Sequence, residues 1–189
     1  MGRRALLTAA TVAAVVAAGC GGAPPATCVD VPSGRGCVDV IDGSHRRAAP
    51  DTTVGLVGGG DASLSDLRGR TVVLNFWASW CGPCRAEQPD LNEAHRQLAG
   101  DDVAFLGVNL QDSESNAQAY IREFAIPYPS LFDPSTSFTA QFEGVGPQAI
   151  PTTIVIDRDG RVAARLFGTT TAGELAAVVR HVVGEHAAP

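Results

Sequence analysis

Residues 71–84 decide the fold, and their sequence is TVVLNFWASWCGPC. The first half, residues 71–77, is a run of β-branched, aromatic and other apolar side chains, which is typical of a strand buried on both faces. After a short turn the pattern predicts a helix over residues 82–99. Cys81 and Cys84 therefore lie where a buried strand gives way to a helix.

Further strands and helices alternate along the rest of the chain. We expect strands at residues 54–57, 103–110, 129–132, 152–156 and 161–167, and helices at 113–125, 135–142 and from 171 onward. Asp159 and Gly160 lie between the last two strands and predict a hairpin turn. Crossover units followed by a hairpin indicate an α/β fold whose central sheet is mixed and has helices on both faces.

The first residues have the pattern of an export signal. Arg3 and Arg4 precede an uncharged run of Ala, Val, Leu and Thr over residues 5–18, and small residues precede Cys20. The run is shorter than the roughly 20 residues of a membrane span. The cleavage region resembles a bacterial lipoprotein signal, which implies that Cys20 is lipidated and anchors the protein to the cell membrane from outside the cytoplasm. Simple secretion and an uncleaved anchor are the alternatives.

Composition divides the chain into three parts. Residues 1–19 form the signal peptide. Residues 20–50 are rich in Gly, Pro, Ser and Ala, which predicts a flexible tether that contains a small stapled loop. Residues 51–189 form the folded domain. The net charge of −6 argues against a nucleic-acid surface.

The five cysteines sort into a lipid site and two pairs. Export implies an oxidising compartment. If Cys20 carries lipid, Cys81 and Cys84 pair by proximity, which leaves Cys28 with Cys37. We expect Cys28 and Cys37 to form a structural disulfide; a second redox pair and free thiols are the alternatives.

The spacing of Cys81 and Cys84 indicates redox chemistry, with no metal and no cofactor. A haem attachment site needs a His directly after the second Cys, where this chain has Arg85. A zinc site needs two more ligands at suitable spacing, and His95 lies eleven positions after Cys84 without a second Cys pair in the domain.

The start of the helix favours a thiolate at Cys81. Unpaired N–H groups and the helix dipole stabilise negative charge there, which lowers the pKa of a cysteine and makes Cys81 the expected attacking thiol. Cys84 lies one turn further on, where it resolves the mixed disulfide. Pro83 presets the backbone of the first turn.

Residues 76–84, FWASWCGPC, resemble the active-site stretch of the thioredoxin family, and the similarity extends from about residue 51 to 183. The resemblance implies the thioredoxin fold. It also implies that Pro151 is a cis-proline and that the backbone before it pairs with a bound substrate chain. The substrate-binding positions implied in this way are Trp80, Gly82, Pro83, Ile150 and Pro151.

Two positions depart from thioredoxin. A buried Asp of that family is replaced by Asn75, and Glu87 stands three residues after Cys84. The pattern Cys-x-x-Cys-Arg-x-Glu-x-Pro, with a helix–strand insertion between residues 113 and 142, resembles the TlpA/ResA/CcmG branch. We therefore expect a thioredoxin fold with N-terminal strands and this insertion. The resemblance implies that Glu87 takes part in proton handling near the resolving Cys, and we expect Glu87 to be partly buried, to have a raised pKa and to accept or relay the Cys84 proton. The alternative is a first-turn Glu that only complements the helix dipole.

The expected function is thiol–disulfide exchange with proteins outside the cytoplasm. Gly-Pro between the cysteines is typical of reducing thioredoxins, and the branch typically reduces apocytochrome c cysteines with electrons from a membrane thiol transporter of the CcdA type. We therefore expect a reductant, with a disulfide-forming oxidase as the alternative.

Two other classes share the fold. A peroxiredoxin needs a Thr shortly before its reactive Cys, which Ser79-Trp80-Cys81 lacks. A copper-delivery protein needs a wider Cys spacing and a distant His ligand, for which His181 and His186 are wrongly placed.

Overall fold

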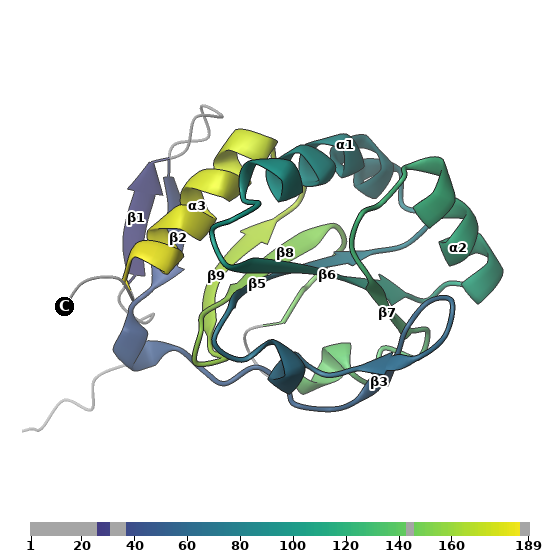
Figure 1. Ribbon diagram of the computed structural model, residues 1–189, viewed down its shortest axis with the longest axis horizontal. Helices are drawn as coiled ribbons and strands as arrows, with labels where there is room; N and C mark the ends of the chain where they lie inside the picture. Colours follow the sequence, from purple (N-terminus) through teal and green to yellow (C-terminus); the bar gives the residue numbers. More distant parts are fainter. Residues whose placement is uncertain (1–25, 31–36, 143–145, 186–189) are drawn as a thin grey trace, which may run out of the picture.

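The computed structural model describes residues 26–30, 37–142 and 146–185 (Figure 1). Its strands are β1 (Ala26–Asp30), β2 (Cys37–Ile41), β3 (Val54–Gly55), β4 (Asp61–Ala62), β5 (Thr71–Trp77), β6 (Val103–Leu110), β7 (Ser130–Asp133), β8 (Thr152–Ile156) and β9 (Val162–Phe167). Its α-helices are α1 (Gly82–Gln97), α2 (Glu114–Glu123) and α3 (Ala172–Glu185), and its 3-10 helices are Gly43–His45, Leu64–Leu67 and Thr139–Gln141.

Seven strands form the main sheet in the order β1-β2-β9-β8-β5-β6-β7. β5 runs parallel to β6 and antiparallel to β8, so the sheet is mixed, as the sequence predicts. All seven residues of β5 are buried because the strand has neighbours on both edges and cover on both faces.

Each face of the sheet has its own hydrophobic core. α1 and α3 pack on the face that carries Val73 of β5, and α2 joins them through Tyr120, which contacts the cluster around Trp77. The opposite face, which carries Leu74, is covered by the two 3-10 helices Leu64–Leu67 and Thr139–Gln141 with the loops around them. None of the described helices is long and apolar enough to cross a membrane.

The helix expected at residues 135–142 is reduced to the 3-10 turn Thr139–Gln141. Two features explain the difference. Thr136 has a left-handed backbone with φ 61°, which interrupts a right-handed helix. The buried carboxylate of Asp133 then accepts hydrogen bonds from the N–H groups of Phe138 and Thr139, at 3.2 and 2.9 Å, which fixes the turn where it starts.

The expected tether over residues 20–50 is corrected by the structure for the described residues from 26 onward. β1 and β2 form an antiparallel hairpin, and Val40 of β2 pairs with Ala164 of β9, so both strands extend the sheet. Val40 belongs to the core under α1 and α3, and Val38 packs against it. The Gly and Pro content of the segment obscured this alternation of apolar and polar residues, which is typical of a strand. Residues 1–25, with Cys20 and the expected signal peptide, lie outside the described residues.

Arg46 joins the N-terminal segment to the rest of the domain. Its guanidinium is buried, pairs with Asp157 at 3.1 Å and with Glu185, and donates to the carbonyl of Ile41 at 2.8 Å. Asp157 also accepts the N–H groups of the hairpin between β8 and β9. One buried cation therefore holds the end of β2, this hairpin and the end of α3 together.

Replacing Arg46 by Ala is expected to lower the free energy of unfolding by about 3–5 kcal/mol, because the buried Asp157 carboxylate loses its partner. Denaturant unfolding measures the change. Arg47→Ala is the matched control: its side chain is exposed, so the expected change is within about 0.5 kcal/mol. Equal effects of the two substitutions on the free energy of unfolding would contradict the role of Arg46 as the residue that holds these segments together.

Candidate functional site

Cys81 and Cys84 form a disulfide at the junction of β5 and α1. Cys81 is the N-cap of α1, and its sulfur accepts the N–H of Cys84 at 3.2 Å. The sulfur of Cys81 thus lies at the positive end of the helix dipole, which favours a thiolate once the pair is reduced. Cys81 is 4% exposed and Cys84 1%, so of the two Cys81 is the more accessible.

Glu87 lies one helical turn after Cys84 and is only 2% exposed, which is deeper than expected. Its carboxylate accepts the side-chain amide of Asn75 at 2.9 Å and the backbone N–H of Thr170 at 3.0 Å. The Asn75 amide also donates to Thr153 at 3.1 Å. Strands β5 and β8 and the loop before α3 therefore fix this carboxylate on the face of α1 that carries the resolving cysteine.

Tyr120 of α2 contacts the backbone of the site, and sequence reasoning missed it. Its hydroxyl donates to the carbonyl of Cys84 at 3.0 Å, and its ring stacks on Trp77 with centroids 4.4 Å apart. Burial raises the pKa of Tyr120 well above its usual value, so the hydroxyl stays a donor at neutral pH. Arg85 lies over the ring of Phe124 at 5.0 Å and adds to the contact between α1 and α2.

Asp112 fixes the turn that leads into Cys81 and was also missed. Its carboxylate accepts the backbone N–H of Ser79 at 2.7 Å, the Ser79 hydroxyl at 2.9 Å and the amide of Asn109 at 3.1 Å. Burial pushes the pKa of Asp112 up, but these hydrogen bonds outweigh it and hold the pKa below its usual value. The turn is therefore tied to a charged carboxylate, which makes strong hydrogen bonds.

Trp80 and Ile150 bring the expected substrate-binding positions together. The Ile150–Pro151 peptide bond is cis, and Ile150 packs against the cluster that contains Cys81 and Cys84. Trp80 is 59% exposed, and its indole N–H donates to the carbonyl of Gln111 at 3.0 Å. Gly82 and Pro83 form the first turn of α1.

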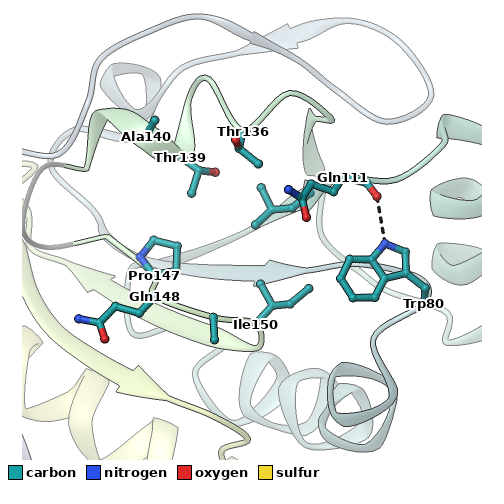
Figure 2. A pocket seen from close by; sticks show the side chains of 10 residues that line it. Trp80, Gln111, Thr136, Thr139, Ala140, Pro147, Gln148 and Ile150 are labelled. Atoms are coloured by element: carbon teal, nitrogen blue, oxygen red, sulfur yellow. Dashed lines mark hydrogen bonds between the residues drawn. The ribbon is translucent and has the colours of Figure 1, made fainter.

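A cleft of about 490 Å³ opens beside Trp80. Figure 2 shows Trp80 with its bond to Gln111, then Thr136, Thr139 and Ala140 along one side and Pro147, Gln148 and Ile150 along the other. We call it the Trp80 cleft.

Cys28 and Cys37 lie on the paired strands β1 and β2, with Cys28 opposite Asp39 and Cys37 opposite Asp30. β2 is separated from β5 by β9 and β8, which places this pair apart from the disulfide of the site. Their disulfide stays a prediction. The described residues contain no group of three or more His, Cys, Asp or Glu that could hold a metal ion.

Similarity to known proteins agrees with this geometry. Residues 46–165 match the AhpC/TSA family. The thiol-disulfide oxidoreductase ResA of Geobacillus thermodenitrificans is 35% identical over 123 residues, which cover 65% of this chain and 69% of the relative.

Two solved structures are similar over most of their length. A DsbF homologue from Corynebacterium diphtheriae has a TM-score of 0.70 and 36% identity, covering 75% of this chain and 90% of that chain. A secreted thiol-disulfide isomerase from Corynebacterium glutamicum has a TM-score of 0.72 and 34% identity, covering 77% and 90%. By sequence and by structure, this chain belongs to the AhpC/TSA family of thioredoxin-like proteins and is a thiol–disulfide oxidoreductase of the ResA/DsbE type.

Proposed function

We propose that the chain reduces disulfides of other proteins outside the cytoplasm. The observation that carries the proposal is the Cys81–Cys84 pair at the start of α1, with Glu87 buried one turn beyond it. Gly82 and Pro83 between the cysteines favour a reductant, because this pair is typical of reducing thioredoxins.

The reaction begins with the reduced pair. The Cys81 thiolate attacks one sulfur of a client disulfide, so a mixed disulfide forms and the other client sulfur leaves as a thiolate that takes up a proton. Cys84 then loses its proton and attacks the sulfur of Cys81, which releases the second client thiol. The pair ends oxidised and the client reduced by two electrons. A dithiol donor must reduce the pair again for the next cycle.

We assign Glu87 as the group that accepts the proton of Cys84. Asn75 occupies the neighbouring position on β5 and cannot titrate, so that strand supplies no acid or base beside the cysteines. The hydrogen bonds from Asn75 and Thr170 orient the Glu87 carboxylate while leaving it on the same helical face as Cys84. That placement suits a general base for the resolving step.

The setting of the reaction follows from the export pattern and the relatives. The similar protein of C. glutamicum is described as secreted, which supports an extracytoplasmic site. The resemblance to the TlpA/ResA/CcmG branch supports anchoring through a lipidated Cys20, apocytochrome c as a client and a CcdA-type membrane thiol transporter as donor. Cys28 and Cys37 are assigned to a structural disulfide across the β1–β2 hairpin, because export favours oxidation.

The reduction potential of the Cys81–Cys84 pair is expected to lie near that of thioredoxin, about −270 mV. Equilibration with a dithiothreitol redox buffer measures it, with Trp fluorescence as the signal. A potential near the −120 mV or so of DsbA would show that the oxidase alternative is correct.

Replacing Cys84 by Ser is expected to trap clients on Cys81, because the mixed disulfide can no longer be resolved. Non-reducing gels of cell extracts detect the adducts, and dithiothreitol should release them. Cys81→Ser with Cys84 intact is the matched control and should trap far less, since Cys84 is the more buried sulfur. Absence of adducts with Cys84→Ser would argue against protein clients.

Replacing Glu87 by Gln is expected to slow resolution of the mixed disulfide about 100-fold at neutral pH, within the usual range for loss of a general base. The step in the pH–rate profile that reports the Glu87 carboxylate should vanish. Stopped-flow measurement of the resolving step gives both results. Glu93→Gln, on the solvent side of the same helix, is the control.

An unchanged pH–rate profile together with unchanged thiol pKa values would favour the alternative role of Glu87, complementing the helix dipole. A melting curve of each variant separates an effect on proton transfer from a loss of stability.

A further inference from the structure

Pro89 interrupts the backbone hydrogen bonds of α1 just behind the two cysteines. A proline has no N–H, so the carbonyl of Arg85 does not receive the bond that residue 89 would give it in a regular helix. Cys81 and Cys84 lie on the N-terminal side of this interruption. The helix itself therefore holds the turn that carries them less firmly, and contacts from side chains matter more for its position.

Gln88 is the residue directly before Pro89, and it is only 1% exposed. Its amide N–H groups donate to the hydroxyl of Tyr128 at 2.9 Å and to the side-chain oxygen of Asn92 at 3.0 Å. Its amide oxygen accepts the hydroxyl of Tyr120 at 3.5 Å. An amide is tolerated in the interior when its polar groups are hydrogen-bonded. The Gln88 side chain is therefore fixed in place, and it joins α1 to α2 and to the segment before β7.

The hydroxyl of Tyr120 connects Gln88 to the backbone of the resolving cysteine. Tyr120 comes from α2, which lies beside α1 (Figure 1). Its hydroxyl donates to the carbonyl of Cys84 at 3.0 Å and, over the longer distance, to Gln88. The shorter bond supplies most of the energy, while the second acceptor limits where the hydroxyl can move. A continuous series of hydrogen bonds thus leads from Gln88 through Tyr120 to Cys84.

This series of hydrogen bonds matters most once the disulfide is open. In the mixed disulfide Cys81 is bonded to the client, so no covalent bond holds Cys84 near it. The Cys84 thiolate must attack the Cys81 sulfur in line with the bond to the client. A new disulfide bond forms, the bond to the client breaks, and the client sulfur leaves as a thiolate that takes up a proton. A displacement of about 1 Å from the reactive geometry can slow such a step by about 100-fold.

We propose that Gln88 is a positioning residue for the resolving step. It holds the Tyr120 hydroxyl against the carbonyl of Cys84 and so keeps the Cys84 sulfur within reach of the mixed disulfide. The inference rests on the proposed function and adds a residue that acts on the chemistry only through Tyr120. The first step uses the sulfur of Cys81, which caps the helix, so that step depends on Gln88 far less than the second.

The test separates the two steps in one stopped-flow experiment with the aromatic disulfide dithiobis(nitrobenzoate). Attack by Cys81 releases a first coloured thiolate at a rate proportional to the reagent concentration, and resolution by Cys84 releases a second at a rate independent of it. Gln88→Leu removes the amide and keeps a similar side-chain volume. It is expected to slow the second release about tenfold and the first less than about twofold, because only the second needs Cys84 in place.

Gln97→Leu is the matched control, because it makes the same chemical change at an exposed residue of α1, whose amide donates to Glu93. Both releases should keep their wild-type rates in this variant. Gln88→Met, which has an unbranched side chain of similar length and no amide, gives the same measurement independently of Gln88→Leu folding. A melting curve of each oxidised variant shows that it is folded.

Tyr120→Phe tests whether Gln88 acts through the Tyr120 hydroxyl. The Phe ring can still stack on Trp77, while the hydroxyl is lost. We expect this variant to slow the second release about tenfold as well. Adding Gln88→Leu to Tyr120→Phe should slow it less than about twofold further, because two residues that act through one contact do not contribute independently.

Three results would overturn the role of Gln88 and leave the proposed function intact. They are an unchanged second release in Gln88→Leu, equal slowing of both releases, and single effects that multiply to about 100-fold in the double variant. The proposed function fails in a different way. A wild-type protein that releases only one thiolate lacks the resolving step on which both ideas depend, and a reduction potential near that of DsbA overturns the direction of electron flow alone.

Discussion

The N-terminus of α1 carries N–H groups that no carbonyl of the helix can satisfy, and it follows directly on a strand buried along its whole length. This junction imposes two conditions on the rest of the structure. The turn before the helix must be rigid, because Cys81, which caps the helix, has to react with a sulfur atom of another molecule. The helix must also stay anchored while its first turn changes between disulfide and dithiol.

Both conditions are met by side chains that come from elsewhere in the fold. Asp112, in the loop that follows β6, holds the turn through Ser79. Tyr120 of α2 holds the carbonyl of Cys84, so the inserted helix contacts the site that it flanks. Glu87 and Asn75 join α1 to the central strand in the buried interior, where a carboxylate must be hydrogen-bonded to be tolerated.

The central strands and the cysteine pair can be predicted from sequence because each leaves a local signal. β6 and β8 consist mostly of apolar and β-branched residues, and their bounds coincide with those expected. Arg46, Asp112 and Tyr120 leave no such signal, since their roles depend on partners that only the fold brings near. Arg46 meets Asp157 across 111 residues, and Tyr120 meets Cys84 across 36. The β1–β2 hairpin was hidden in a different way, by the Gly and Pro residues around two short strands.

The start of β1 and the reactive disulfide lie at opposite ends of the sheet, which we call its two poles. Ala26 lies opposite Ile41, the last residue of β2, and the segment after β2 leads to Arg46. Arg46 pairs with Asp157, which follows directly on β8, and Ile156 at the end of β8 lies opposite Val72 near the start of β5. Cys81 follows the other end of β5, one strand length of roughly 20 Å away. Ala26, where the described part of the chain begins, therefore lies at one pole of the sheet, and the disulfide lies at the other.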